Sequence, residues 1–190
     1  MQTTQHDAIV ATTQAWIEKA VIGLNLCPFA KSVYVKNQIR YTVSLATEVD
    51  ALLEELEEEL QILHASDPAD IDTTLLILPD VLGDFLDYND FLDLADAVIE
   101  KLELDGKIQI ASFHPDYQFA GTKADDIENY TNRSPYPILH LLRESSIERA
   151  VEAFPKAEDI YEKNMETLRR LGIEGWQNLH LATPPRPNTK

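Results

Sequence analysis

Hydrophobic residues recur along the chain with two different spacings, and each spacing predicts a type of secondary structure. Apolar residues three and four positions apart predict helices over 8–22, 47–63 and 88–104. Residues 39–45 alternate between apolar and polar, which is typical of a half-buried strand. Residues 73–79 form a short, continuous apolar run that predicts a strand buried on both faces, and "KIQIASFH" at 107–114 predicts a third strand.

The C-terminal part of the chain begins with an irregular segment. Residues 114–134 contain few apolar side chains and show no clear period. Compact domains carry structureless loops of this length mainly where the loop is functional or disordered. Periodic apolar residues resume after the loop and predict three further helices, over 136–144, 146–153 and 156–171.

The order of these elements predicts the fold class. Strands separated by single helices favour an α/β protein with a small, mainly parallel sheet of about three to four strands, flanked by helices, with extra C-terminal helices. The alternative is a ferredoxin-like α+β arrangement, which needs a clear fourth strand. We expect one globular domain over residues 1–182, followed by a flexible proline-rich tail at 183–190.

Charge and composition narrow the classes of partner. The 190 residues carry a formal net charge of −17, which repels phosphate backbones and lipid head groups, so we expect no nucleic-acid partner. No apolar run approaches the roughly 20 residues that span a bilayer, so we expect no membrane partner either. The N-terminus lacks a secretory pattern and the chain has one cysteine, which favours a cytoplasmic location. The six glycines form no nucleotide-binding loop, so the sequence identifies no cofactor. It does not predict an oligomeric state.

The ends of the predicted strands indicate where a site should lie. In open α/β sheets, ligands bind outside the carboxyl ends of the strands. In a parallel sheet this rule places Asp80, His114 and Asp116 at one rim, where the irregular segment adds Gln118 and Asn132. His114 is a candidate general acid or base, with Asp116 orienting its ring. The alternative for His114 is a structural hydrogen bond to a backbone carbonyl.

Cys27 stands directly before Pro28, at the predicted start of a helix. A thiol at a helix N-terminus has a lowered pKa, and a neighbouring histidine would activate it as a nucleophile. Cysteine is also among the most buried residue types, so packing as a small apolar side chain is the alternative.

Two arginines are candidates for binding a small anionic ligand. Arg143 is three positions after His140, so the two share one face of the predicted helix over 136–144. Arg133 would complete a forked clamp for a carboxylate or phosphate. The alternative is that Arg133 fixes the long loop to the acidic body. Cysteine, histidine and aspartate are also suitable zinc ligands, but their spacing matches no compact metal motif, so no metal site is predicted.

Three segments together resemble an uncharacterised bacterial family, the domain-of-unknown-function family fourteen-fifteen. They are "GLNLCPFAKS", "ASFHPDYQFAGT" and "NYTNRSPYPILHLLRESS". The resemblance extends from the first helix to about residue 171 and implies a single-domain, cytoplasmic bacterial protein. It implies no reaction. The residues that match the family pattern are Cys27, Pro28, Phe29, His114, Pro115, Gln118, Phe119, Asn132, Arg133, Ser134, Pro135, His140 and Arg143.

Two functional hypotheses follow from these residues. The first is an enzyme-like site, in which Cys27, His114 and Asp116 are catalytic and the remaining side chains bind a small anion. Those binding residues are Gln118, Asn132, Arg133, His140 and Arg143. The second is a non-catalytic binding or scaffold protein, in which the same side chains form a buried structural network.

Overall fold

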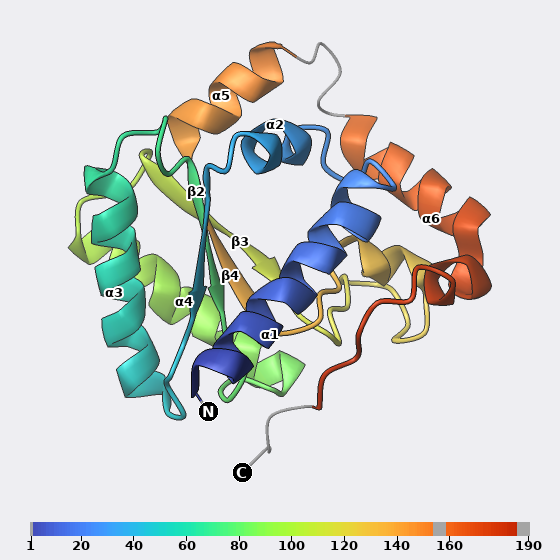
Figure 1. Ribbon diagram of the computed structural model, residues 1–190, viewed down its shortest axis with the longest axis horizontal. Helices are drawn as coiled ribbons and strands as arrows, with labels where there is room; N and C mark the ends of the chain where they lie inside the picture. Colours follow the sequence, from blue (N-terminus) through green and yellow to red (C-terminus); the bar gives the residue numbers. More distant parts are fainter. Residues whose placement is uncertain (1, 154–158, 186–190) are drawn as a thin grey trace.

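The computed structural model describes residues 2–153 and 159–185, and the fold is that of an α/β protein (Figure 1). Four strands form one sheet: β1 (Ile39–Val43), β2 (Thr73–Ile77), β3 (Ile108–Phe113) and β4 (Ile138–Arg143). Helices α3 (Val49–Ala65) and α4 (Phe85–Lys101) cover one face, and α1 (Gln2–Trp16) crosses the other. The remaining helical elements are η1 (Ile17–Ile22), α2 (Ala30–Val35), η2 (Ile127–Thr131), α5 (Glu144–Glu152) and α6 (Ile160–Gln177).

The sheet is mixed, with strand order β1-β2-β4-β3. β1 and β2 are parallel, and β4 pairs with both β2 and β3 in the antiparallel sense. The α/β class with C-terminal helices is therefore confirmed, although the predicted mainly parallel sheet is imprecise: β1, β2 and β3 share one direction, and β4 lies reversed between two of them. The ferredoxin-like alternative requires a βαββαβ order, whereas this chain runs β1-α3-β2-α4-β3-β4.

The predicted helix over 136–144 is wrong, because these residues form strand β4. Apolar side chains at 138, 139, 141 and 142 fit the spacing of a helix, but they fit a strand covered on both faces equally well. Pro135 and Pro137 set an extended backbone immediately before the strand. The strand is central, and its pairing with two neighbours satisfies the backbone hydrogen-bonding groups that a helix would satisfy internally.

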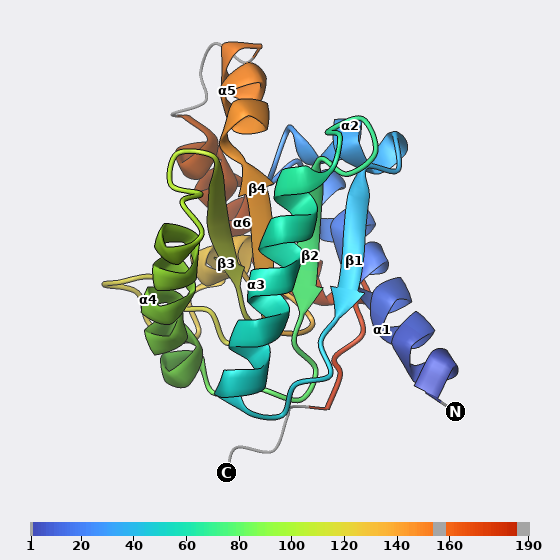
Figure 2. The ribbon, with the colours of Figure 1, turned by 90° about the vertical axis from the view of Figure 1, so that its left-hand side faces the viewer.

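Two apolar layers pack against the sheet. Leucines of α3 pack with Leu76, Leu139 and Leu141 on one face. On the other face, Trp16 and neighbouring side chains of α1 and η1 pack with residues of β2 and β4. The predicted burial of the 73–79 strand on both faces is confirmed, because every residue of β2 is buried. Figure 2 shows α3 lying in front of the sheet in this arrangement.

Two helix ends differ from the predictions because of local backbone chemistry. α4 begins at Phe85, since the Asp84 side chain accepts hydrogen bonds from the backbone N–H groups of Leu86 and Asp87. The helix predicted over 156–171 continues to Gln177 in α6: Gly172 has φ 65°, which glycine adopts without strain, and it forms a kink inside this helix.

Candidate functional site

The carboxyl ends of β2 and β3 meet the amino end of β4 at one rim of the sheet. Ile138 of β4 pairs with Ile77 on one side and with Phe113 on the other. The buried Tyr88 hydroxyl fixes this junction, since it donates to the carbonyl oxygen of Ile138 (2.7 Å) and accepts from the N–H of Phe113 (3.1 Å). The loop after β3 therefore leaves the sheet from a rigid position.

His114 is fully buried at this rim, between Phe85 and Tyr88. Its Nδ1 accepts a hydrogen bond from the backbone N–H of Asp116 (3.0 Å), so the proton is on Nε2, which donates to the carbonyl oxygen of Leu82 (3.2 Å). The imidazole thereby joins the 114–116 turn to the loop after β2. This geometry matches the structural interpretation of His114.

The irregular segment predicted at 114–134 is held by amide side chains and by Arg133. The buried Asn129 accepts from the N–H of Phe119 and from the Thr122 hydroxyl, and donates to the carbonyl oxygen of Lys123. The Asn132 amide donates to the carbonyl oxygen of Ser112 (3.1 Å), and the Gln118 amide to that of Thr122 (2.6 Å). These bonds lie within the segment or join it to β3.

Arg133 spans the same segment. Its Nε donates to the carbonyl oxygen of Tyr117 (3.2 Å) and its Nη2 to that of Ala124 (2.5 Å). Its guanidinium carbon lies 4.4 Å from the centre of the Tyr130 ring, within the range of a cation–π contact. The contacts of Arg133 match the alternative in which this residue fixes the loop.

Arg143 lies at the opposite end of β4 from Arg133. It is buried, and its guanidinium donates to the carbonyl oxygens of Leu63, Ser66 and Ile71. Leu63 lies in the last turn of α3, and the other two residues follow this helix. The positive charge complements the negative end of the helix dipole. Because the six residues of β4 separate the two arginines by roughly 20 Å, they do not form the predicted clamp.

His140 and Arg143 do not share a face. Residues three apart on a strand point to opposite sides of the sheet, whereas the prediction of a common face assumed a helix. His140 projects to the α1 side, where its Nε2 lies 2.7 Å from the Thr73 hydroxyl. Burial lowers the pKa of His140 to about 4, so the imidazole is neutral at neutral pH.

A cavity of about 850 Å³ lies against the α1 side of the sheet, and we call it the sheet-face cavity. Its floor is formed by side chains of all four strands, its walls by α1, η1, α2 and α5. α2 and α5 lie at the same end of the sheet in both ribbon views (Figures 1 and 2). The lining includes Trp16, Cys27, Thr73, Ala111, His140 and Ile147.

The mouth of the sheet-face cavity is marked by exposed residues of its lining. Lys36 and Arg149 are the basic ones, and Arg149 lies 4.0 Å from the carboxylate of Asp72. Asp72 also accepts from the Ser146 hydroxyl (2.6 Å). Polar groups are thus concentrated at the mouth, while the interior is mostly apolar.

Cys27 lines the sheet-face cavity and is half-buried. Burial raises the pKa of its thiol, and hydrogen bonds from the backbone N–H groups of Phe29 and Ala30 only partly offset this effect. The predicted fall in pKa is therefore wrong. The expected helix start is also later: α2 begins at Ala30, with a turn between Cys27 and the helix.

We expect Cys27 to react slowly with iodoacetamide in the native protein. Because burial raises the pKa of the thiol, the alkylation rate at pH 7.5 should be at least about 10-fold below that of the urea-unfolded chain. Mass spectrometry of timed samples measures this rate without ambiguity, since the chain has one cysteine. A native rate equal to or above the unfolded rate would contradict the buried, unactivated thiol.

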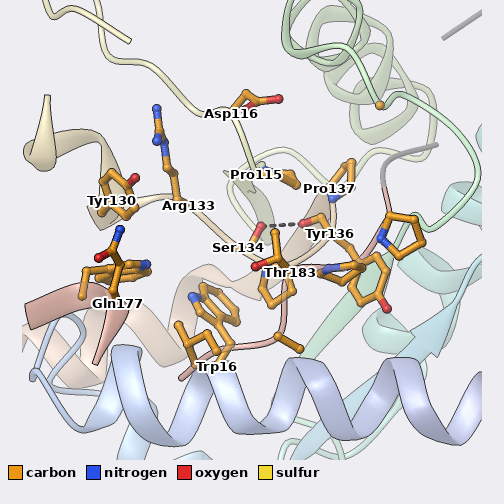
Figure 3. Close-up of a pocket in the computed structure, with 17 residues that line it drawn as sticks. Trp16, Pro115, Asp116, Tyr130, Arg133, Ser134, Tyr136, Pro137, Gln177 and Thr183 are labelled. Carbon is orange, nitrogen blue, oxygen red and sulfur yellow. Dashed lines mark hydrogen bonds between the residues drawn. The ribbon is translucent and has the colours of Figure 1, made fainter. Parts of the chain in front are cut away.

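A second, smaller cleft of about 410 Å³ lies at the sheet rim and is called the rim cleft (Figure 3). Asp116 and Arg133 line it with Trp16, Tyr130 and Ser134, and the segment 181–185 closes one side. In Figure 3 the Arg133 side chain points away from Trp16 and lies beside Tyr130. Residues 183–185 of the predicted flexible tail thus form part of this cleft, and residues 186–190 lie outside the described chain.

The predicted site residues separate into four groups. Cys27 and His140 line the sheet-face cavity, and Asp116 and Arg133 line the rim cleft. His114 and Arg143 are buried in hydrogen-bonded positions, and Gln118 and Asn132 bond to backbone carbonyl oxygens of the loop and of β3. Two lining residues, Thr73 and Ala111, were not among the predicted site residues. Both lie in predicted strands, but a strand pattern does not reveal that the helices leave part of one sheet face uncovered.

The described residues offer neither a cluster of metal ligands nor a helix that could cross a membrane. Residues 2–153 and 159–185 contain no group of three or more histidine, cysteine, aspartate or glutamate side chains that could hold a metal ion. In the same part of the chain, no helix combines the length and the apolar character needed to cross a bilayer.

The fold and its cavities define the class: an α/β protein with a four-stranded mixed sheet and a large apolar cavity on one sheet face. The chain belongs to the family described as "Protein of unknown function (DUF1415)", which matches residues 8–178. The resemblance of the three sequence segments is thereby confirmed. Neither a curated protein nor a solved structure matches the chain.

Proposed function

We propose that this chain is a non-catalytic binding protein for an uncharged, largely apolar small molecule, held in the sheet-face cavity. The observation that carries the proposal is the cavity itself. Its volume of about 850 Å³ lies within the range of about 300–1,000 Å³ that is usual for small-molecule sites. Most of its lining residues are aliphatic or aromatic, as in sites that bind by apolar burial, and its basic side chains lie at the mouth.

The charges in the cavity favour binding over nucleophilic catalysis. Activation of Cys27 by His140 would require a thiolate beside an imidazolium. Burial raises the pKa of Cys27 and lowers that of His140 to about 4, so both side chains are neutral at pH 7. A neutral thiol is a poor nucleophile.

The same reasoning favours an uncharged ligand over the small anion that the sequence suggested. Arg133 and Arg143 already donate to backbone carbonyl oxygens, and neither lines the sheet-face cavity. The neutral His140 offers no positive charge inside it. Lys36 and Arg149 lie at the mouth, so an anion buried in the interior would lose its hydration without an adjacent positive charge, which is strongly unfavourable.

Binding of the uncharged dye Nile red tests this proposal. We expect saturable fluorescence enhancement with the native protein, with one dye per chain. Ala111→Trp should weaken binding at least about 10-fold, because Ala111 lies on the cavity floor beside His140 and the indole would fill the space. Ala8→Trp is the matched control, since Ala8 is exposed on α1 and outside the cavity.

Two outcomes would contradict the proposal. One is the absence of saturable binding to the native protein. The other is equal binding by the wild type and by Ala111→Trp, once circular dichroism shows both to be folded. Cys27 provides an independent signal, because a ligand in the cavity should slow alkylation of its thiol further.

A further inference from the structure

His140 and Thr73 are polar residues on the floor of the sheet-face cavity, and their hydrogen bonds determine which nitrogen of the imidazole is left to bond a ligand. The Thr73 hydroxyl lies 2.6 Å from the carbonyl oxygen of Leu141 and 2.7 Å from His140 Nε2. A carbonyl oxygen only accepts, so the single Thr73 proton is donated to Leu141. The Thr73 oxygen then accepts from His140, which places the imidazole proton on Nε2.

Because the buried imidazole is neutral, the other ring nitrogen, Nδ1, carries no proton and is a hydrogen-bond acceptor. It makes no hydrogen bond with any residue of the described chain. His140 lies deep in the protein, yet it lines the cavity and keeps part of its surface accessible there. The ring of Phe113 lies beside it, with the ring centres 6.1 Å apart. Nδ1 is therefore the ring nitrogen left to accept a hydrogen bond from a molecule in the cavity.

We infer that the ligand is an uncharged apolar molecule carrying a hydroxyl group, which donates a hydrogen bond to Nδ1 of His140. This inference rests on the proposed binding function and adds the chemical class of the ligand. A carboxylate has no proton to donate to Nδ1. An ammonium group has one, but its charge would be desolvated without a counter-ion in the interior. A hydroxyl group supplies the donor without a charge.

Thr73 acts as a positioning residue for this contact, because its oxygen holds the proton on Nε2. Its neighbour Thr74 provides a matched comparison. Thr74 is also fully buried, but its side chain points to the α3 side of the sheet and its hydroxyl has no hydrogen-bond partner in the described chain. Replacing either threonine with valine keeps the shape of the side chain and removes only the hydroxyl group.

The test is competition against Nile red by three eight-carbon compounds: 1-octanol, its isomer 1-methoxyheptane, and octanoate. We expect the wild-type protein to prefer the alcohol to the ether by about 10-fold, the equivalent of one buried hydrogen bond. Octanoate should bind more weakly than the alcohol. His140→Phe should reduce the alcohol-to-ether ratio to about 1, Thr73→Val should reduce it to about 3 or below, and Thr74→Val should leave it unchanged.

The outcomes separate this inference from the function on which it rests. Saturable Nile red binding with an alcohol-to-ether ratio of 1 in the wild type overturns the hydroxyl contact and leaves the apolar site. A 10-fold ratio that persists in folded His140→Phe also overturns the contact, as does octanoate binding as tightly as the alcohol. Absence of Nile red binding to the native protein overturns both proposals together.

Discussion

Replacing Arg143 with methionine should lower the free energy of unfolding by about 3–4 kcal/mol. The guanidinium donates to three carbonyl oxygens, of Leu63, Ser66 and Ile71, and it is buried. Methionine matches the apolar stem but leaves these carbonyls without their donor and removes a positive charge from the C-terminal end of α3. Urea unfolding followed by circular dichroism measures the change.

Arg149→Met is the matched control for this experiment. Arg149 lies 4.0 Å from the Asp72 carboxylate, and its side chain is 63% exposed. Exposed ion pairs contribute little, so we expect a change below about 0.5 kcal/mol. The loss of unfolding free energy in Arg143→Lys should lie between those of Arg143→Met and Arg149→Met, because one ammonium group cannot reach all three carbonyl oxygens. A loss below about 1 kcal/mol in Arg143→Met would refute the structural role of Arg143.

His114→Ala should lower the free energy of unfolding by about 3 kcal/mol. The substitution leaves a space between Phe85 and Tyr88, and it removes the partners of the Leu82 carbonyl and the Asp116 N–H. Nile red binding should be retained at temperatures where the variant is folded, because His114 does not line the sheet-face cavity. Chemical unfolding and dye titration of the same samples give both quantities.

A second substitution at position 114 tests whether the lost hydrogen bonds cause the lower stability of His114→Ala. The oxygen of an asparagine side chain can accept from the N–H two residues later, as His114 Nδ1 does. His114→Asn should therefore recover about 1 kcal/mol relative to His114→Ala. His64→Ala, at an exposed position in the last turn of α3, is the control for loss of a histidine. Full stability of His114→Ala together with lost dye binding would favour a ligand site at His114 instead.

Local sequence patterns predicted most of the fold because most elements have one interpretation. The buried run at β2 and the alternation at β1 were recognisable from sequence alone. Strand β4 was predicted as a helix because "ILHLLR" is apolar enough for either a helix or a central strand. Only its pairing with β2 and β3 distinguishes the two structures. The paired residues are 61 to 69 positions apart in β2 and β4, and 25 to 35 positions apart in β3 and β4, so the pairing leaves no local signal.

The candidate site was predicted less completely than the fold. The rim containing Asp116 followed from the direction of β2 and β3, which the sequence predicted correctly. The error at β4 then placed His140 beside Arg143, whereas the strand turns them to opposite faces. The sheet-face cavity depends on how far α1, α2 and α5 stand from the sheet, and this is a property of tertiary packing.

The position of β4 has a consequence for how the protein is made. Among the residues that the structure describes, β4 is the last strand and the only strand that pairs with β3, and it is also one of the two neighbours of β2. During synthesis, the first three strands leave the ribosome before their central partner exists, so the sheet cannot close until residue 143 has emerged. Until then β2 keeps an unpaired edge, and a chain truncated before β4 would expose that edge permanently.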